Sequence, residues 1–181
     1  SSTGLLLQET LPGKLLIIGG GAIGIEFAYV TKSFGSEVTV VEVMDRILPF
    51  EDEEISSALE KTFKKKGIEI MTGTKAVSME INDNKVSVVL EDNKGVRKTT
   101  VVDQILVAVG RIPNSSGIGL EKVGIEVEKG FIKVGDYYQT AVPNIYAVGD
   151  VINTPLLAHV ASKAGEIAVE HMAGLNPPKR I

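Results

Sequence analysis

The chain of 181 residues has no cysteine and only two histidines, His159 and His171. The absence of cysteine excludes a disulfide scaffold, a thiol nucleophile and a cysteine-ligated metal within this chain. Two histidines without any cysteine argue against a zinc site as well. We therefore assign no metal-ligating residue, and no side chain is assigned a catalytic role.

Long hydrophobic runs and an excess of basic charge are also missing. No apolar stretch approaches the roughly 20 residues needed to cross a bilayer, and the start, SSTGLLLQETLPGK, lacks the features of a signal peptide. The net charge of −4 gives no attraction to nucleic acid or to an anionic membrane. We expect a cytoplasmic or organelle-matrix setting. Because the chain lacks an initiator methionine, we also expect a processed or excised piece.

The most informative feature that is present is a glycine-rich turn between two apolar runs. Leu15–Ile18 leads into GGGAIG at 19–24, an amphipathic stretch follows, and the second run, Glu37–Val41, ends on Glu42. Strand, glycine turn, helix, strand and terminal acid, in that order, are typical of a dinucleotide-binding βαβ unit. An ordinary glycine turn would explain the glycines, but not an acid at the position where a ribose would lie.

Each residue of this pattern has a physical reason. Gly19 permits the tight turn, Gly21 leaves the backbone open to a pyrophosphate, and Gly24 lets the helix pack closely on the strand. The N–H groups at the helix start favour a negative charge. Glu42 can bind both ribose hydroxyls, although it could also be an exposed strand-end acid. Arg46 could accommodate a 2′-phosphate, but a single arginine beside an intact glutamate favours NAD over NADP.

The pattern as a whole predicts an α/β fold, in which a Rossmann-like parallel sheet contains an antiparallel meander as a crossover. The first helix should end at Gly35 and bury Ile23, Phe27, Val30 and Phe34; the second, Glu51–Lys66, should bury Ile55, Leu59 and Phe63. The remaining strands are predicted at Ile68–Met71, Ala76–Ile81, Lys85–Glu91, Gly95–Thr100 and Asp103–Val109.

After Pro113 the apolar segments become shorter and loop residues more frequent. Strands are expected at Phe131–Val134 and Asn144–Val148, and a helix at Leu157–Ala173 with a small apolar face of Ala161, Ala164, Ile167 and Ala168. A Pro-rich stretch, 176–181, closes the chain. We therefore expect an entry segment at 1–12, a nucleotide-binding domain at 13–115, and at 116–181 a segment too small for an independent core.

Several motifs recur in an order that resembles one family. These are SSTG, IIGGGAIGIE, VTVVE, ILPFEDEEI, VAVGRIPN, TAVPNIYAVGD and LLAH. The set resembles the flavin-dependent pyridine nucleotide–disulfide oxidoreductases over almost the whole chain, and within them most of all the dihydrolipoamide dehydrogenase branch. That resemblance implies an NAD domain inserted in a split FAD-binding domain, of which 116–181 would be a fragment. It also implies an enzyme that oxidises dihydrolipoamide through a cysteine pair and FAD while reducing NAD.

The resemblance also implies cofactor-binding residues. For NAD it implies the turn and helix start, the strand-end acid, the adenine edge and a further glycine: Gly19, Gly20, Gly21, Ala22, Ile23, Gly24, Ile25, Glu26, Glu42, Ala76 and Gly110. For FAD it implies Asp150, Leu156, Leu157, Ala158 and His159. Plainer interpretations exist for some of them: Glu26 as an acid favoured by the helix dipole, Asp150 as a cap or turn residue, and His159 as a surface residue. His171 has no motif around it and is expected at the surface.

Three parts of the family pattern are missing from this sequence: the first FAD fingerprint, the CxxxxC redox pair and the C-terminal interface domain. We therefore expect the central portion of such an enzyme, which binds NAD(H) but does not catalyse, with FAD retention doubtful. Its partners would be the missing domains, in a homodimer within a 2-oxoacid dehydrogenase complex. The alternatives are the same portion of an NADH oxidase, a mercuric reductase or a coenzyme A disulfide reductase, or a non-catalytic nucleotide-binding or structural module.

Overall fold

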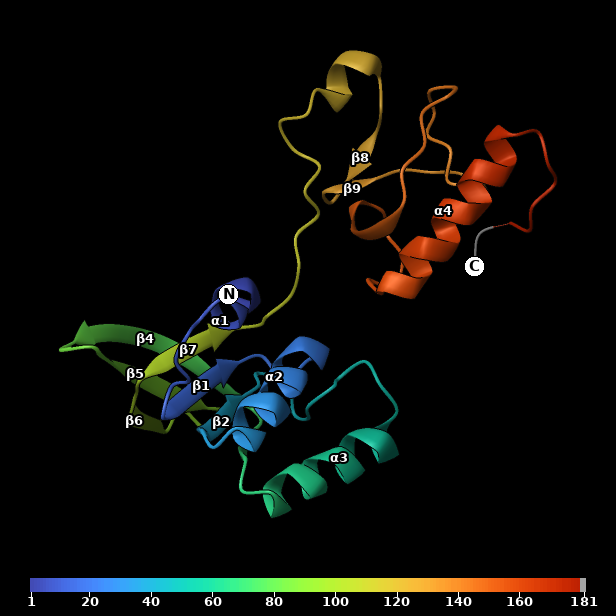
Figure 1. The fold of residues 1–181 in the computed structure, drawn as a ribbon. Helices are drawn as coiled ribbons and strands as arrows, with labels where there is room; N and C mark the ends of the chain where they lie inside the picture. The colour runs from blue at the N-terminus through green and yellow to red at the C-terminus, as the bar shows by residue number, and fades with distance from the viewer. Residues whose placement is uncertain (180–181) are drawn as a thin grey trace. The chain divides into compact units, whose positions relative to one another are not determined.

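The computed structural model describes residues 1–179, and it divides the chain into two compact units, Ser1–Gly110 and Arg111–Ile181 (Figure 1). The division falls between Gly110 and Arg111, whereas the sequence placed the end of the first domain at 115. The Pro-rich stretch predicted at 176–181 ends with Arg180 and Ile181, which lie outside the described residues. Among residues 1–179, no helix combines the length and apolar character needed to cross a bilayer.

Unit 1 is built on a parallel sheet with the strand order β3-β2-β1-β7. Its strands are β1 (Lys14–Ile18), β2 (Glu37–Val41), β3 (Glu69–Met71) and β7 (Gln104–Val107). Strand β1 lies in the centre, where Ile18 is in register with Val41 on one side and with Val107 on the other. The carboxyl ends of β1, β2 and β7 therefore meet at one edge of the sheet, as the predicted α/β fold requires.

An antiparallel meander forms the crossover from β3 to β7, as predicted. It consists of β4 (Thr74–Asn82), β5 (Lys85–Asp92) and β6 (Arg97–Val102). The third strand begins later than the predicted Gly95. The reason is that the Asp92 carboxylate accepts hydrogen bonds from the backbone N–H groups of Lys94 and Val96, which draws these residues into the turn.

Side chains of β1 alternate between two cores. Leu15 and Ile17 pack with the helices α2 (Ala22–Ser33) and α3 (Glu53–Lys65), whereas Leu16 packs with Val88 and Leu90 of the meander. In Figure 1 the two helices lie on one side of the parallel sheet and the meander on the other. Because both faces of β1 are covered, the strand reads as an unbroken apolar run.

Helix α2 buries a different face from the predicted one. Val30 and Phe34 are 46% and 75% exposed, and the buried positions are Gly24, Ile25, Ala28 and Thr31. The physical reason is the close approach of Gly24 to β1, which turns this face of the helix toward the sheet. Positions one, four and seven residues after Gly24 then follow it into the core.

Helix α3 also departs from its predicted stripe. Phe63 is buried and Leu59 partly buried, but Ile55 is 61% exposed. Ser56 is buried in its place, and its hydroxyl donates to the backbone oxygen of Ile47. The helix begins at Glu53 because the carboxylate of Asp52 accepts from the N–H groups of residues 54 and 55, which makes Asp52 the N-cap.

Unit 1 also contains the short helix α1 (Ser2–Leu6). Unit 2 has its own core around α4 (Ala158–Met172): of the predicted apolar face, Ala164, Ile167 and Ala168 are buried and Ala161 is partly buried. Its other elements are β8 (Val127–Glu128), β9 (Phe131–Ile132) and the 3-10 turns η1 (Leu120–Val123) and η2 (Gly149–Val151).

The strand predicted at Asn144–Val148 is wrong as a regular element. Within the described residues, this segment forms one isolated bridge, between Gln139 and Tyr146. Two neighbouring backbone bonds, from Thr140 to Ile145 and from Ala147 to Tyr138, extend the contact without forming a ladder. The apolar pattern correctly marked a buried stretch, since Ala147 lies in the core of unit 2.

Candidate functional site

The glycine turn lies at the carboxyl edge of the parallel sheet, between β1 and α2. Gly19 has φ +109°, and a Cβ there would lie 2.4 Å from the backbone oxygen of Ala108. A Cβ on Gly24 would lie 2.0 Å from the backbone oxygen of Gly19. Both positions therefore require glycine because the backbones approach each other closely.

Gly21 differs from these two glycines, because a Cβ placed there would meet no described atom within 4 Å. Gly21 is also the N-cap of α2, where no described side chain caps the helix. The first helical bond runs from the N–H of Ile25 to the oxygen of Gly21 at 3.0 Å, so the N–H groups of residues 22–24 precede the helical ladder. An open approach beside unbonded N–H groups at a positive helix end suits a phosphate.

The carboxylate of Glu42 lies beside this turn. Glu42 is 8% exposed, and one carboxylate oxygen accepts from the N–H of Gly20 at 2.6 Å. The other oxygen accepts from the N–H of Met44 at 2.8 Å. Glu42 is therefore not an exposed strand-end acid. It is a buried acceptor held by two backbone N–H groups beside the glycine turn, at the position predicted to face a ribose.

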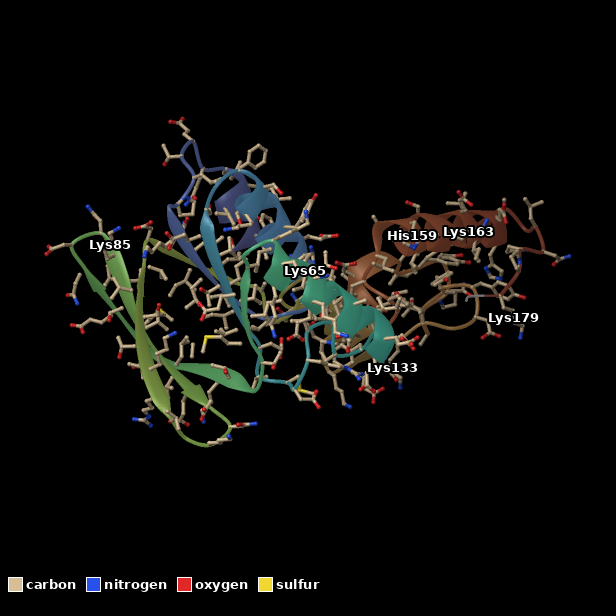
Figure 2. All side chains as sticks on the ribbon, turned by 90° about the horizontal axis from the view of Figure 1, so that it is seen from below. Lys65, Lys85, Lys133, His159, Lys163 and Lys179 are labelled. Atoms are coloured by element: carbon tan, nitrogen blue, oxygen red, sulfur yellow. The ribbon has the colours of Figure 1, made fainter. Side chains whose placement is uncertain are left out.

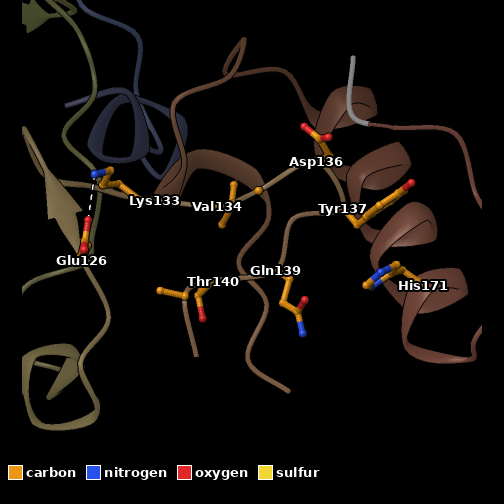
Figure 3. Close-up of a pocket in the computed structure, with 10 residues that line it drawn as sticks. Glu126, Lys133, Val134, Asp136, Tyr137, Gln139, Thr140 and His171 are labelled. Carbon is orange, nitrogen blue, oxygen red and sulfur yellow. Dashed lines mark hydrogen bonds and ion pairs between the residues drawn. The ribbon is translucent and has the colours of Figure 1, made fainter. Parts of the chain in front are cut away.

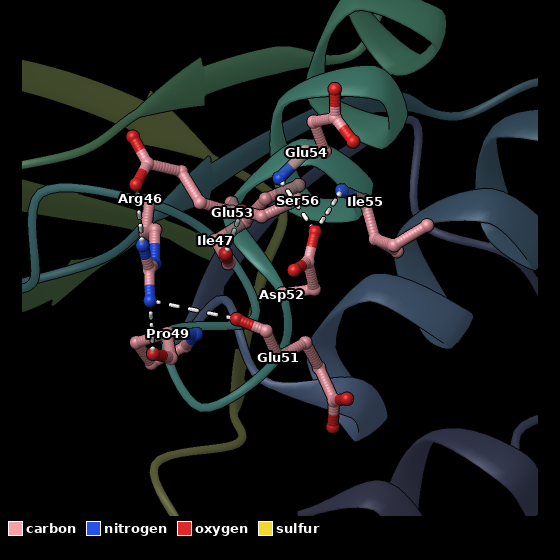
Figure 4. A network of polar contacts seen from close by, with 9 residues as sticks. All are labelled: Arg46, Ile47, Pro49, Glu51, Asp52, Glu53, Glu54, Ile55 and Ser56. Carbon is pink, nitrogen blue, oxygen red and sulfur yellow. Dashed lines mark hydrogen bonds and ion pairs between the residues drawn. The ribbon is translucent and has the colours of Figure 1, made fainter.

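Loop 43–52, which joins β2 to α3, forms a second wall of the turn. The N–H of Leu48 donates to the oxygen of Gly20 at 2.8 Å, and Ile47 is fully buried behind it. The guanidinium of Arg46 donates to the backbone oxygen of Pro49 at 3.0 Å and lies 3.7 Å from the carboxylate of Glu53 (Figure 4). The sequence gives no hint of a role for Leu48, because a contact that a loop leucine makes through its backbone leaves no signal in residue type.

Two further predicted residues lie on segments that are attached to this turn. The N–H of Thr74, two residues before Ala76, donates to the backbone oxygen of Glu42 at 2.9 Å. Gly110 follows β7, where the N–H of Ala108 donates to the oxygen of Ile18 at 2.8 Å. Gly110 has φ +138°, with no described atom within 4 Å of a built Cβ. The side chain of Ala76 itself packs against the meander core.

The remaining predicted residues of the turn lie around the first turns of α2. Ala22 and Glu26 are exposed, Ile23 is partly buried and Ile25 is buried. Ala22 and Glu26 therefore present their side chains to solvent, whereas Ile25 packs in the core next to the buried Gly24. The structure thus brings Gly19–Gly24 together with Glu42, and leaves Glu26 on the accessible side of the helix.

The residues predicted for FAD lie in unit 2. Asp150 is inside the 3-10 turn η2, and its carboxylate lies 3.4 Å from the guanidinium of Arg111. Leu156 and Leu157 are 37% and 48% exposed, just before α4, and Ala158 and His159 begin that helix as exposed residues (Figure 2). The described residues of unit 2 offer one ion pair and an exposed apolar edge here, which do not by themselves enclose a flavin.

A separate cavity of about 420 Å³ in unit 2 contains none of the predicted site residues (Figure 3). His171 lines it, stacked on Tyr137 with ring centroids 4.4 Å apart, and its Nδ1 lies 2.8 Å from the hydroxyl of Tyr146. His171 was expected at the surface, and it keeps part of its surface exposed while making these contacts. These two aromatic contacts give it a structural role in unit 2.

The carboxyls with displaced pKa values lie away from the glycine turn. A hydrogen bond from Lys85 and another from the N–H of Lys14 lower the pKa of Asp103, and Lys14 begins the strand whose other end carries the turn. Hydrogen bonds from Lys75 and Arg97 lower the pKa of Glu91 on the meander. No cluster of three metal-ligating side chains occurs among residues 1–179.

Comparison with protein families gives one match over most of the chain. The profile described as pyridine nucleotide-disulphide oxidoreductase matches residues 1–165. A dihydrolipoyl dehydrogenase of Thermus scotoductus is 47% identical over 178 residues, which cover 97% of this chain and 39% of that protein. One from Bacillus subtilis is 48% identical over 174 residues, covering 95% and 36%. The chain therefore spans about two fifths of the length of these curated relatives.

Solved structures agree with the sequence relatives. The flavoprotein disulfide reductase RclA of Escherichia coli, described as induced by HOCl, superposes with a TM-score of 0.88 at 31% identity, covering 98% of this chain and 40% of that one. LpdA of Mycobacterium tuberculosis superposes with a TM-score of 0.84 at 33% identity, covering 94% and 37%. Both cover the two units of this chain almost completely.

Proposed function

The chain belongs to the pyridine nucleotide-disulphide oxidoreductase family, and we propose that it binds NAD(H) at the glycine turn of unit 1. The pyrophosphate lies against the N–H groups at the start of α2, and the adenosine ribose against Glu42. One observation carries the proposal. The open position in front of Gly21 lies beside a buried carboxylate that is hydrogen-bonded to the adjacent Gly20.

The same geometry supports NAD(H) over NADP(H). A 2′-phosphate would bring negative charge to the buried carboxylate of Glu42, where the reduced dielectric strengthens repulsion. The nearby cation, Arg46, donates to the backbone oxygen of Pro49 and faces Glu53. Ala76 and Gly110 line the adenine edge and the dinucleotide in this proposal, and Glu26 lies toward the nicotinamide.

Full-length members of this family are flavoproteins that use FAD and a pyridine nucleotide. The whole protein from which this chain derives would oxidise dihydrolipoamide and reduce NAD, in keeping with the names of its relatives in Thermus scotoductus and Bacillus subtilis. In that reaction FAD supplies the electron transfer between a cysteine pair and the nicotinamide. This chain has no cysteine, so its own part is to bind and orient the nucleotide.

The FAD assignment concerns unit 2 together with parts of the protein outside this sequence. Asp150 would contact the ribityl or pyrophosphate part of FAD, and Leu156, Leu157, Ala158 and His159 would lie along the flavin. Support comes from their exposure, since all five lie at the accessible end of α4 or in the turn before it. In this proposal the whole protein forms a homodimer and works within a 2-oxoacid dehydrogenase complex.

A sibling reaction is the alternative, because the flavoprotein disulfide reductase RclA is similar over 98% of this chain. The full-length protein should be assayed for NADH formation from dihydrolipoamide, and in parallel for NADH-dependent reduction of oxygen, mercuric ion and coenzyme A disulfide. NADH formation from dihydrolipoamide as the fastest reaction supports the proposal. A faster reaction with one of the other acceptors assigns the protein to that sibling activity.

Nucleotide binding by this chain is tested by calorimetric titration with NADH, NADPH and FAD. Because the carboxylate of Glu42 makes charge-assisted hydrogen bonds to the ribose, Glu42→Ala should weaken NADH binding about 10- to 100-fold. Glu37→Ala is the matched control, since Glu37 lies at the other end of β2 and is exposed. Equal NADH affinity in the wild type and Glu42→Ala would refute the ribose assignment.

A further inference from the structure

Loop 43–52 is attached to the glycine turn at two points. The N–H of Met44 donates to one oxygen of the Glu42 carboxylate, and the other oxygen accepts from the N–H of Gly20. The N–H of Leu48 donates to the backbone oxygen of the same Gly20 at 2.8 Å. Gly20 is therefore held between the strand-end acid and the loop, so the orientation of the carboxylate depends on the loop's conformation.

The loop adopts a conformation that needs support. Leu48 has φ +46°, a left-handed value that a leucine rarely adopts and that persists where surrounding contacts over-determine it. On its N-terminal side the support is clear, because Ile47 is fully buried and its oxygen accepts from the hydroxyl of Ser56. On the C-terminal side, residues 49–51 are exposed or partly exposed and bury no side chain.

One backbone bond closes this side, from the N–H of Glu51 to the oxygen of Leu48 at 3.0 Å, and Arg46 adds the side-chain support (Figure 4). Its Nη2 donates to the backbone oxygen of Pro49 at 3.0 Å and lies 3.5 Å from that of Glu51, while Nη1 lies 3.7 Å from the carboxylate of Glu53. The planar guanidinium thus spans the residues that follow Leu48, a geometry that a lysine ammonium cannot reproduce. The Arg46 side chain is only 34% exposed, which is consistent with a bracing role.

From this geometry we infer that Arg46 is a positioning residue of the dinucleotide site, which braces loop 43–52 and so holds Gly20 and Glu42 in place for the adenosine ribose. The inference deepens the proposed function and rests on it. It also assigns Arg46 a role opposite to that of a phosphate ligand. Its Nη2 is directed at backbone oxygens of the loop and its Nη1 faces Glu53, so Arg46 favours NAD(H) by supporting Glu42 rather than by binding a 2′-phosphate.

The test compares Arg46→Met, which keeps much of the aliphatic stem, with Arg46→Lys, which keeps the charge. Arg97→Met is the matched control, because Arg97 pairs with Glu91 on the meander. Two quantities are measured: the Kd values for NADH and NADPH, and the hydrogen-exchange rate of the Leu48 amide without nucleotide. The melting temperature of each variant shows that it is folded.

Arg46→Met should weaken NADH binding about 5- to 10-fold, as expected for the loss of one or two hydrogen bonds that orient the site. NADPH should not be affected more than NADH, and the Leu48 amide should exchange faster. Arg46→Lys should give an intermediate loss, and the Arg97→Met control should match the wild type in both measurements. If Arg46→Met folds poorly, the NADH affinity and the Leu48 exchange rate of Arg46→Lys still test the inference.

Two results would overturn the inference. One is wild-type NADH affinity and wild-type Leu48 exchange in folded Arg46→Met or Arg46→Lys. The other is a loss confined to NADPH, which would identify Arg46 as a phosphate ligand. If the wild type binds no NADH, the proposed function fails separately, while the exchange rate of the Leu48 amide still decides whether Arg46 braces the loop.

Discussion

At the scale of single residues, the three glycines of the motif have different physical roles. Gly24 is required by packing, because a Cβ there would lie 2.0 Å from a backbone oxygen that cannot rotate away. Gly21 has open space in front of it, so its lack of a side chain matters only when a ligand approaches. The family motif therefore combines a folding requirement with a binding requirement, and substitution can separate the two.

Gly24→Ala should lower the stability of the fold, whereas Gly21→Ala should lower the affinity for NADH. Because Gly24→Ala forces the helix away from β1, it should destabilise the fold by about 1–3 kcal/mol, seen as a lower melting temperature. Gly21 has φ −74°, which alanine adopts readily, so Gly21→Ala should melt close to the wild type and bind NADH more weakly by calorimetry. Normal NADH affinity in folded Gly21→Ala would show that the pyrophosphate lies elsewhere.

Much of the site could be predicted residue by residue, because glycines and a strand-end acid carry their function in their identity. The sequence predicted Gly19, Gly21, Gly24 and Glu42, and the structure brings them to one edge of the sheet. It did not predict Leu48, whose contact with Gly20 is made by the backbone. Roles of that kind depend on loop conformation, which leaves no trace in residue type.

At the scale of elements, the parallel strands were predictable because buried strands read as unbroken apolar runs, and the meander because clusters of turn residues separate its strands. The buried face of α2 was not. Its apolar residues Phe27, Val30 and Phe34 recur at helical spacing, yet the close approach of Gly24 selects the face. The strand expected at Asn144–Val148 does not form for another reason. A strand needs a neighbouring strand to hydrogen-bond with, and apolar residues alone do not specify one.

Asp103 connects the meander to the parallel sheet. Its carboxylate accepts from the N–H of Lys14 in β1 at 2.7 Å and pairs with Lys85 of β5. These contacts, with Lys85 first, lower the pKa of Asp103 below its ordinary value. A lowered pKa means that the stabilisation is present above the unfolded pKa and is lost as pH falls through the folded value.

Asp103→Asn should therefore lower the melting temperature at neutral pH and lose its effect in acid. The comparison is a series of melting curves of the wild type and Asp103→Asn from pH 7 down into the acidic range in which the wild-type carboxyl becomes protonated. Glu121→Gln is a suitable control, because Glu121 is an exposed carboxyl in unit 2. A difference between wild type and Asp103→Asn that stayed constant with pH would contradict the role of the charged carboxylate.

At the scale of the whole molecule, each unit has its own hydrophobic core. Unit 1 contains the two clusters on either face of β1, and unit 2 contains the cluster around α4. All residues proposed to hold NAD(H) lie in Ser1–Gly110. The proposed nucleotide site thus lies within unit 1, and the residues assigned to FAD lie in unit 2.

Residues 1–110 expressed alone should therefore fold and bind NADH with an affinity within about threefold of the full chain, a difference of well under 1 kcal/mol. Circular dichroism and calorimetry measure folding and affinity. The complementary piece, 111–181, should bind no NADH. Loss of binding in a folded 1–110 piece would show that unit 2 contributes to the site.

The most direct test of the account is to map NADH onto the chain by the backbone amide chemical shifts of the isotopically labelled protein. We expect the largest shifts at Gly20–Gly24 and at Met44 beside Glu42, with saturation at the calorimetric Kd. Residues of the meander turns, such as Asn84, should not move. Saturable shifts centred elsewhere, or none at Gly20–Gly24, would contradict the claim that the glycine turn and Glu42 hold the dinucleotide.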